Sequence, residues 1–484
     1  MQKISTLIAM LCILLFVKVT YDQVTVAANN ALPDMGSSTN KILPLNIEQQ
    51  LGDYYMRILR QQLPIIDDPQ IREYINELGF RLVASNDDAK NRQFYFFVVN
   101  DPSVNAFAMP GGYIGINTGL IQSAENVSEL AGVMSHEIAH VTQRHLARRI
   151  EKQDQLSMPM LLATLGSILV MTQNSEAGMA AMTGLQAGVS QIMINYTRSN
   201  ESEADRIGIA TLANANFDPT GMGTFFEKML KLSRYRGVRL AFLSTHPLSQ
   251  ARITESRDRA RNINVVVKEN NFKFSLFKER LANFLPQNKN SIKRIYENKL
   301  ANSKNEQFLT TTQFGYALIL TTLSEHEPAI TILKKLLKEN PGNKYFLLAL
   351  AQIYSTSGDP KSAIKLLEVP YRLNPGNDPI TMSYAKALLA DQQIKRSLDI
   401  LYEHLPKVEK EPSIYQLIAE AQSSDGLFKE VHESTGLYLY HSGDLHGALA
   451  QFKMAMKGRS DDPYFNSRLR ARIKKVQKEI IDTR

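Results

Sequence analysis

Cysteine is nearly absent from this chain of 484 residues: its single cysteine, Cys12, lies in an uncharged apolar run from Ile4 to Val17. A basic start, an apolar run of this length and the small residues Ala27 and Ala28 are typical of a secretory signal peptide, here residues 1–27. The alternative is an uncleaved N-terminal anchor, for which the run is short. Cleavage after Ala27 or Ala28 leaves no cysteine and excludes disulfide bonds, so we expect domains that are stable through packing alone.

Long hydrophobic runs are also lacking beyond the N-terminus. The uncharged stretch Leu156–Met171 continues as a glycine- and methionine-rich segment to Ile194. Pro159 and several hydroxyl and amide side chains interrupt it, so it lacks the ~20 apolar residues that a membrane span needs. We predict that residues 156–194 form an amphipathic lid over the functional site or a peripheral contact with a membrane surface.

Neither disorder nor a concentrated charge is indicated by the composition. Hydrophobic residues make up 44% and charged residues 21%, as in ordinary globular domains, and the length allows two or three domains. The net charge of +8 is spread along the chain, so we interpret it as solvated surface and expect no nucleic-acid partner.

Helix and strand patterns alternate between residues 44 and 262, which predicts one mixed domain. Apolar spacing predicts a helix over Ile71–Leu82, and a β-branched and aromatic run predicts a strand over Phe94–Val99. A Pro-Gly-Gly turn between two short apolar runs predicts a β-hairpin over residues 106–116. A longer helix is expected over Ser128–Ile150.

The C-terminal part, residues 308–484, follows a helical connector at 263–307 and repeats itself. The segment Asn340–Asn343 recurs as Asn374–Asn377, and other apolar pairs recur at the same spacing. A period of about 34 residues with these features is typical of tetratricopeptide repeats, the alternative being a helical bundle with chance matches. Because such arrays present a concave surface, we expect this part to bind peptides or proteins.

The motif that indicates chemistry is His136-Glu137-Ile-Ala-His140 within the longer helix. Residues four apart lie on one helix face, so His136 and His140 can both reach one metal ion. Neutral imidazoles suit Zn²⁺, and no thiol is present to select a softer metal. Glu137 is close enough to accept a proton from an attacking water without binding the metal.

A third ligand is needed, because catalytic zinc is held by three protein groups with one position open. His145 follows His140 by five residues and is expected to point elsewhere on the helix, as a structural or solvent histidine. Further along, Glu201 and Asp205 open another helix and lie four apart, on one face. This spacing directs the carboxylates of Glu201, as a ligand, and of Asp205 toward the expected zinc site.

At these residues the chain resembles a known family. Three segments closely resemble those of the HtpX- and CAAX-endopeptidase-type zinc metallopeptidases. They are the helix that contains His136 and His140, the segment Glu201–Gly208 (ESEADRIG) and the hairpin segment Asn105–Tyr113 (NAFAMPGGY). The resemblance implies an α+β, mostly α fold: a zincin-like peptidase domain with a small sheet, followed by an α-solenoid of tetratricopeptide repeats. It also implies one Zn²⁺ per chain and the following roles: His136, His140 and Glu201 as ligands, Glu137 as catalytic base, and Asp205 as orienter of a ligand histidine or as proton donor.

With a signal peptide and C-terminal repeats, the chain is similar to the β-barrel assembly-enhancing proteases within that group. This resemblance extends over nearly the whole exported chain. It implies a periplasmic location and a role in outer-membrane protein assembly, either promoting it or degrading stalled barrels. The implied partners are unfolded or stalled outer-membrane proteins and, through the repeats, the β-barrel assembly machinery.

The hairpin suggests how a substrate binds. A strand edge beside the zinc helix could pair with an extended peptide through main-chain hydrogen bonds. The candidate substrate-binding residues are Ala106, Phe107, Ala108, Gly111 and Gly112.

His246, in Ser244-Thr-His246-Pro247, has two interpretations. It could take the fourth position on the zinc and make the enzyme latent, or it could be a turn histidine fixed by Pro247. Three functions therefore remain at the level of sequence: a periplasmic endopeptidase with substrate-binding repeats, a chaperone-like adaptor with a largely latent protease site, and an integral-membrane peptidase.

Overall fold

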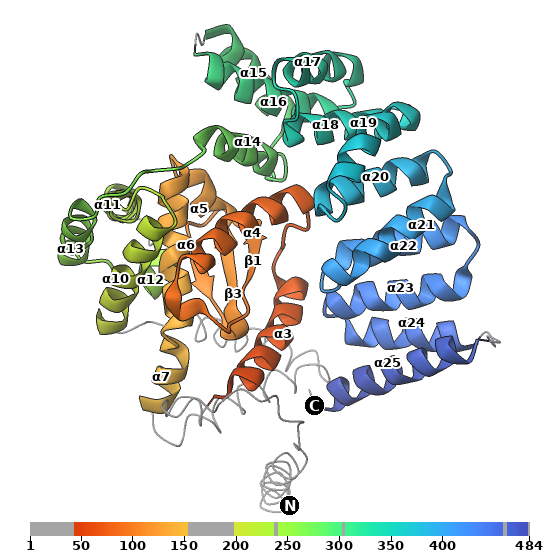
Figure 1. Ribbon diagram of the computed structural model, residues 1–484, viewed down its shortest axis with the longest axis horizontal. Coiled ribbons are helices and arrows are strands. Elements are labelled where there is room, and N and C mark those ends of the chain that lie inside the picture. Colours follow the sequence, from red (N-terminus) through yellow and green to blue (C-terminus); the bar gives the residue numbers. More distant parts are fainter. Residues whose placement is uncertain (1–42, 153–197, 237–240, 303–304, 458–461, 483–484) are drawn as a thin grey trace, which may run out of the picture.

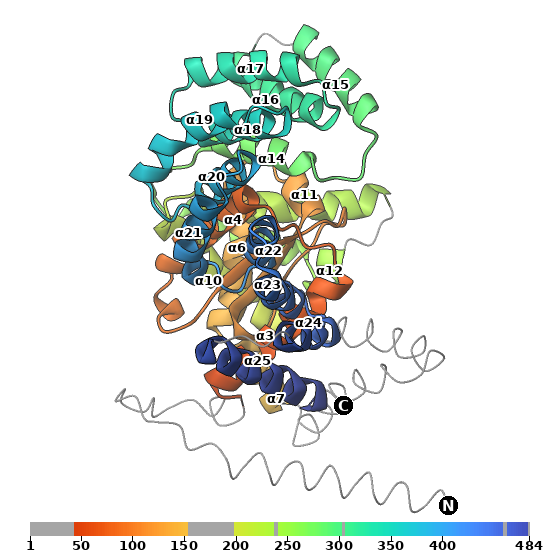
Figure 2. The ribbon, with the colours of Figure 1, turned by 90° about the vertical axis from the view of Figure 1, so that its right-hand side faces the viewer.

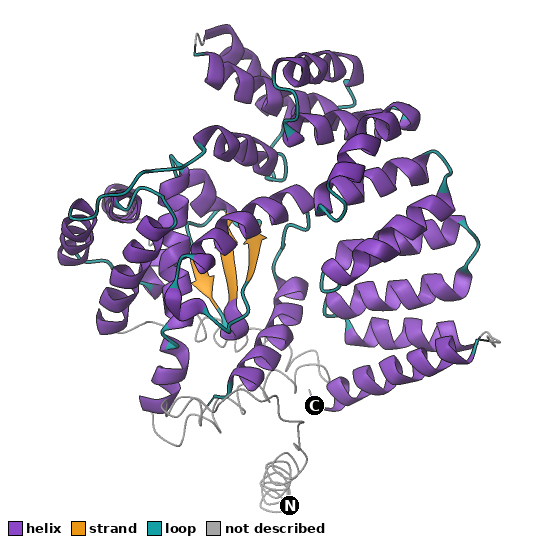
Figure 3. Cartoon of the chain, viewed as in Figure 1, coloured by secondary structure: helices purple, strands orange, loops and turns teal. Residues whose placement is uncertain are grey.

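The computed structural model describes residues 43–152, 198–236, 241–302, 305–457 and 462–482. These residues are mostly helical and contain one three-stranded sheet (Figure 3), which confirms the predicted α+β, mostly α class. The expected signal peptide and the stretch at 156–194 lie outside the described residues. Within the described ranges, no helix has both the length and the hydropathy required to cross a membrane.

The N-terminal half contains the sheet and the helices packed around it (Figure 1). In chain order its elements are α3 (Leu45–Gln62), α4 (Pro69–Ala84), η1 (Asp87–Ala89), β1 (Tyr95–Val99), β2 (Ala106–Ala108), η2 (Pro110–Gly112), β3 (Tyr113–Asn117), α5 (Thr118–Ser123), α6 (Val127–Thr142), α7 (His145–Lys152), α10 (Arg198–Asn214), α11 (Thr220–Arg236), α12 (Ala241–Thr245) and α13 (Gln250–Arg261).

The sheet has the strand order β1-β3-β2. Strands β2 and β3 pair antiparallel around the turn at η2, so the predicted hairpin is confirmed. The predicted strand at Phe94–Val99 is β1, which pairs with β3 in parallel. Gly115 in β3 lies opposite both Phe97 and Phe107, whose rings pack edge to face at 5.9 Å. A Cβ on Gly115 would lie 2.5 Å from the Phe107 ring, so this register needs glycine.

Helix α4 connects the sheet to the second half of the chain. It begins at Pro69, and the Asp68 side chain accepts hydrogen bonds from the first free N–H groups, as a capping residue does. Asp68 also forms an ion pair with Arg280 at 2.6 Å. On the apolar face of α4, Tyr74 stacks on Phe277 with ring centroids 4.1 Å apart. One hydrophobic core therefore continues from the sheet into the helices that follow.

The remaining helices form a curved array that runs over the top and down the right-hand side of the sheet-bearing half as drawn in Figure 1, and Figure 2 shows it from that side. They are α14 (Asn271–Ala282), α15 (Lys289–Asn302), α16 (Glu306–Thr322), α17 (His326–Glu339), α18 (Lys344–Thr356), α19 (Pro360–Leu373), α20 (Asp378–Ala390), α21 (Ile394–His404), η3 (Leu405–Lys407), α22 (Pro412–Ser424), α23 (Phe428–His441), α24 (Leu445–Lys457) and α25 (Pro463–Asp482).

The repeated sequence Asn-Pro-Gly-Asn explains the turns of this array. Gly342 and Gly376 adopt φ of 84° and 95°, a left-handed conformation that glycine adopts readily. The asparagine after each glycine, Asn343 or Asn377, caps the next helix by accepting main-chain N–H groups with its side chain. Sequence repeats 34 residues apart thus produce the same helix–turn–helix unit, as a tetratricopeptide array requires.

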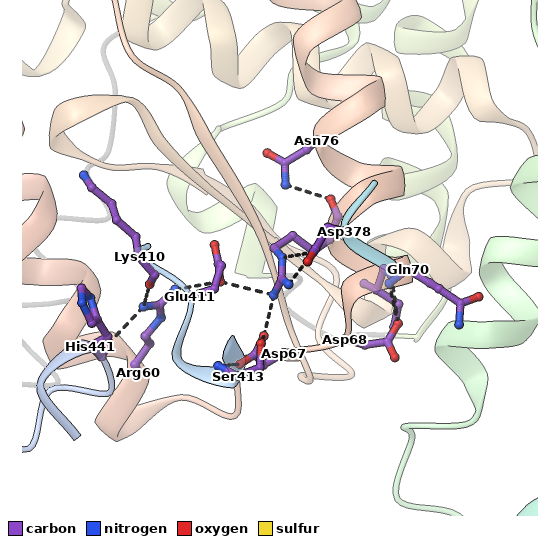
Figure 4. Close-up of polar contacts among 12 residues, drawn as sticks. Arg60, Asp67, Asp68, Gln70, Asn76, Asp378, Lys410, Glu411, Ser413 and His441 are labelled. Atoms are coloured by element: carbon purple, nitrogen blue, oxygen red, sulfur yellow. Dashed lines mark hydrogen bonds and ion pairs between the residues drawn. The ribbon is translucent and has the colours of Figure 1, made fainter. Parts of the chain in front are cut away.

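Charged contacts join the array to the first half of the chain (Figure 4). Arg60 of α3 donates to the Lys410 carbonyl at 2.7 Å and forms an ion pair with Glu411 at 3.3 Å. Arg72 of α4 lies 3.3 Å from Glu411 and 2.6 Å from Asp378. Because these arginines have side chains only 10–12% exposed, the network is largely shielded from water, and the array and the sheet-bearing half form one packed body.

Candidate metal centre

Helix α6 contributes three polar groups to a buried centre. It begins after Asn126, whose side chain accepts the Glu129 N–H, and all its residues are buried. His136 and Glu137 are fully inaccessible to solvent and His140 is 2% exposed. A polar group this deep must find a polar partner or a ligand, since an unpaired buried group is costly.

Helix α10 crosses α6 closely and contributes two carboxylates. At the crossing, a Cβ on Gly208 would lie 3.1 Å from the His136 main-chain N, so glycine permits the close approach. Glu201 and Asp205 then face α6 and are 1% and 5% exposed. Their spacing of four residues places both toward one centre, as the sequence predicts.

The structure brings four candidate ligands together: His136, His140, Glu201 and His246, with one donor atom from each within 4.8 Å of the others. The Nε2 atoms of His136 and His140 are 3.0 Å apart, and they lie 3.6 and 3.5 Å from the oxygens of the Glu201 carboxylate. His246 follows α12, and its Nδ1 lies 3.1 Å from Glu201 Oε1. Three imidazoles and one carboxylate are a donor set that fits a divalent zinc-type ion.

Burial and neighbouring charges shift the pKa values of the groups in the centre in different directions. Burial lowers the pKa of His136, but hydrogen bonds to Asp205 and Glu201 outweigh it and raise that pKa to about 9. Burial and the neighbouring His136 hold the pKa of His140 well below its ordinary value. Burial raises the pKa of Glu201, but His246 and His136 outweigh it and lower the pKa, so the carboxylate is ionised.

Glu137 lies at the edge of this cluster. Its Oε1 is 3.4 Å from His246 Nε2, and neither carboxylate oxygen makes a hydrogen bond of ordinary geometry. Burial raises the pKa of Glu137, against opposing effects of His246, His136 and the main-chain N–H of Ala108. A buried carboxylate with a raised pKa and free lone pairs is suited to exchanging protons with a reactant.

Arg252, on α13, fixes the two carboxylates of α10. Its guanidinium donates to both oxygens of Asp205 at 2.8 Å and lies 2.8 Å from Glu201 Oε2. Asp205 Oδ1 is 3.0 Å from His136 Nδ1, so Nε2 of that ring is directed at the cluster. Arg252 also donates to the Pro247 carbonyl at 2.7 Å and so holds the chain next to His246. The sequence alone gives no reason to pair Arg252 with Asp205, which lies 47 positions earlier in the chain.

His145 lies beyond a break in the predicted helix. The predicted helix over Ser128–Ile150 is wrong in its extent: α6 ends at Thr142 and α7 begins at His145. Between them Arg144 has φ of +52° and its side chain is buried, with a 3.1 Å ion pair to Glu48. The helix axis breaks there, and His145 lies outside the group of four candidate ligands, as a buried structural histidine behind the His140 ring. Its Nδ1 lies 2.7 Å from His140 Nδ1.

The hairpin residues predicted to bind substrate lie on the edge strand β2 and its turn. Main-chain bonds join Asn105 to Asn117 (3.0 Å) and Met109 to Tyr113 (2.7 Å). Because antiparallel bonding alternates, the main-chain polar groups of Ala106 and Ala108 point away from β3, while Phe107 shares its register with Gly115.

The two turn glycines have a structural reason of their own. Gly111 and Gly112 adopt φ of 72° and 76°, and a Cβ on Gly112 would lie 1.9 Å from the Gln93 carbonyl oxygen. Glycine is therefore required at the turn by backbone conformation and packing.

Comparisons with known proteins agree with this architecture. Residues 69–260 match the model of peptidase family M48, and residues 324–370 match a tetratricopeptide repeat model. The chain is 36% identical over 395 residues to the β-barrel assembly-enhancing protease of Escherichia coli K12, covering 82% of this chain and 80% of the relative. A Vibrio cholerae counterpart is 40% identical over 401 residues, covering 82% and 81%. The mitochondrial metalloendopeptidase OMA1 of Schizosaccharomyces pombe is 31% identical over 186 residues, 37% of this chain and 50% of that protein.

The buried histidine–glutamate cluster lies within the region that matches family M48, and it is compatible with the metal site of a metallopeptidase. The helical array accounts for the repeat match, and the similarity to the bacterial relatives extends over both parts. The chain is therefore a metalloprotease that belongs to the β-barrel assembly-enhancing proteases.

Proposed function

We propose that this protein is a periplasmic zinc-dependent endopeptidase that promotes outer-membrane β-barrel assembly and degrades misassembled or stalled barrels. The observation that carries the proposal is the buried cluster of His136, His140 and Glu201 with Glu137 beside it. Two imidazoles and a carboxylate are the ligands of many catalytic zinc sites.

Each residue of the cluster has a distinct role in this proposal. His136, His140 and Glu201 hold Zn²⁺, which when bound acts as a Lewis acid and lowers the pKa of water. Glu137 takes the proton of the attacking water and passes it to the leaving amine. Asp205 orients His136 through the 3.0 Å contact to Nδ1, and its pairing with Arg252 favours this role over proton donation.

The substrate is proposed to be an extended peptide added to the outer edge of β2. Ala106 and Ala108 direct main-chain groups to that edge, and the Ala108 N–H faces Glu137 closely enough to oppose the burial that raises its pKa. Recognition through main-chain groups depends on an extended backbone rather than on one side chain. Cleavage should therefore require unfolded or edge-exposed segments, as a quality-control protease needs. Equal cleavage rates for a tightly folded protein and its unfolded form would contradict this substrate model.

The proposed periplasmic location and partners rest on the similarity to the bacterial β-barrel assembly-enhancing proteases and on the N-terminal sequence, which is typical of a signal peptide. Tetratricopeptide arrays bind other proteins, and the array here is proposed to contact the β-barrel assembly machinery and unfolded or stalled outer-membrane clients. Chaperone-like assistance would use the same surface without peptide cleavage.

The test of the proposed function is metal content and casein cleavage of the wild type against Glu137→Gln. Wild-type protein should hold about one zinc per chain, and the isosteric variant should keep the zinc and lose cleavage. Glu201→Ala should lose both, most clearly in a His246→Ala background, where only His136 and His140 remain and two ligands hold zinc poorly. Stoichiometric zinc in Glu201→Ala would show that the third ligand is a different residue, and cleavage by Glu137→Gln would remove Glu137 from the reaction.

A second candidate function, a client-binding adaptor with a latent protease site, is favoured by the position of His246. Its ring is 1% exposed, stacks on Phe242 with centroids 4.8 Å apart, and lies 3.3 Å from His136 Nε2. An imidazole in the open position of a catalytic zinc displaces the attacking water. In this state the enzyme stays inactive until movement of the chain around Pro247 withdraws the histidine.

His246→Ala separates the two readings. If His246 blocks the site, the variant should cleave casein faster than the wild type with its zinc content little changed. Loss of cleavage while zinc stays bound would instead make His246 a contact to the substrate or transition state, and latency would be excluded.

A further inference from the structure

We infer that His145 is a positioning residue for His140: with Glu203 it fixes the orientation and tautomer of that imidazole and thereby strengthens metal binding. The inference rests on the proposed role of His140 as a metal ligand. It adds two residues that neither the motif nor its spacing indicates.

A continuous chain of side chains carries the inference. His140 Nδ1 lies 2.7 Å from His145 Nδ1, on the side of the His140 ring opposite the cluster. His145 Nε2 lies 3.0 Å from Glu203 Oε2, and Arg148 lies 2.8 Å from the same carboxylate oxygen. His145 is fully buried, whereas the side chains of Glu203 and Arg148 are 28% and 41% exposed. The chain therefore runs from the centre of the protein to its surface.

Proton positions along this chain are mutually determined. Glu203 accepts only, so the hydrogen of His145 must lie on Nε2. His145 Nδ1 is then an acceptor, and the hydrogen of His140 must lie on Nδ1. The Nε2 atom of His140 is then the unprotonated nitrogen, and it faces the cluster, 3.0 Å from His136 Nε2 and 3.5 Å from Glu201. The arrangement presents the tautomer that a metal requires.

The break between α6 and α7 makes this contact possible. In a continuous helix, a residue five positions after His140 would lie about 140° further around the axis and could not meet its ring. Arg144, with φ of +52°, redirects the chain, and its ion pair to Glu48 holds the turn. Arg144 thus brings His145 to His140 although Arg144 itself is not among the candidate ligands.

The two metal-facing histidines are each oriented by a separate set of side chains. His136 is held by Asp205, which Arg252 fixes, and His140 is held by His145 and Glu203, which Arg148 fixes. Helix α10 supplies a carboxylate to each set as well as Glu201 itself. A partner of this kind typically contributes 10–100-fold to metal affinity or activity.

The experiment measures the zinc dissociation constant of the full exported chain by competition with a chelator. His145→Leu should weaken zinc binding about 10–100-fold. His145→Asn should stay close to the wild type, because the amide oxygen can take the place of Nδ1 as acceptor. The Co²⁺-loaded protein gives a second readout, since its visible absorption reports ligand geometry directly and should change in the Leu variant.

Controls separate positioning from general stability and from the proposed function. His432→Leu removes a half-buried histidine of the array, bonded to Gln451 at 2.7 Å, and should leave zinc affinity unchanged. If His145→Leu does not fold, Glu203→Leu carries the same test from a partly exposed position. Wild-type affinity and Co²⁺ spectrum in these variants would overturn the inference. Retention of zinc by His140→Ala would instead overturn the role of His140, and with it the proposed site.

Discussion

Removal of the Arg252 side chain should destabilise the protein, because it holds two buried carboxylates of the centre. It is 7% exposed and compensates two buried carboxylates, Glu201 and Asp205, through three contacts of 2.8 Å. Arg252→Leu removes one cationic partner from each carboxylate without removing either charge. Breaking a buried ion pair in this way costs about 3–5 kcal/mol, because an uncompensated charge is left away from water.

The assay is thermal unfolding of metal-free protein. For a domain of the size of the peptidase half, 1 kcal/mol corresponds to roughly 2–4 °C, so Arg252→Leu should lower Tm by about 6–20 °C. The Tm of Arg252→Lys should lie between those of the wild type and Arg252→Leu, because an ammonium keeps the charge but cannot form the forked contact with Asp205. Zinc should reduce the loss in Arg252→Leu, since a bound cation compensates Glu201.

A matched control lies on the same helix. Arg257 pairs with Glu227, and the two side chains are 36% and 30% exposed. Arg257→Leu should cost no more than about 1 kcal/mol, because solvent screens such a pair. Equal Tm shifts in Arg252→Leu and Arg257→Leu would refute the reasoning from burial.

The remaining predictions concern packing and pH. Gly132→Ala should destabilise by about 1–3 kcal/mol in urea unfolding, since its Cβ would lie 2.8 Å from the main chain of Met222. Gly223→Ala should be nearly neutral, because the atom nearest to its Cβ, at 3.2 Å, belongs to the flexible Arg257 side chain and the Arg257 main-chain N is 3.8 Å away; equal losses would contradict this. Burial and nearby arginines lower the pKa of His441 to about 3. Below about pH 6.5 the unfolded chain therefore binds a proton at this histidine that the folded chain does not, and the free energy of unfolding should fall by ~1.4 kcal/mol per pH unit. His441→Phe keeps the stacking on Tyr415 and should lose less stability than the wild type between pH 7 and 5; an unchanged loss would argue against the shift.

The metal cluster was largely predictable because its spacing is local. His136 and His140, and separately Glu201 and Asp205, are four apart in helices, so helical periodicity alone places each pair on one face. The hairpin was predictable for a similar reason, since its turn residues are contiguous.

What the sequence could not provide depends on contacts between distant segments. Arg252 meets Asp205 only because α13 packs on α10, and β1 pairs with β3 in a parallel register that no local pattern specifies. The position of His145 depended on one residue, Arg144, adopting a positive φ. The periodicity of the flanking residues suits a continuous helix. The contacts of the Arg144 side chain with Glu48 and the Leu43 carbonyl are tertiary, and they stabilise the break between α6 and α7.

The strand order has a consequence for self-association. A sheet of three strands has two edges, and open edges invite pairing with other chains. The outer edge of β1 is covered by the segment before α4, where Ile66 N–H donates to Val98 at 2.9 Å and Asn100 N–H donates to Pro64 at 2.8 Å. Among the residues that the structure describes, no strand pairs with the outer edge of β2. Within these residues the open edge of the sheet is the one that faces Glu137. If the proposed function holds, a strand-forming chain that adds to this sheet would do so at the place where cleavage is proposed.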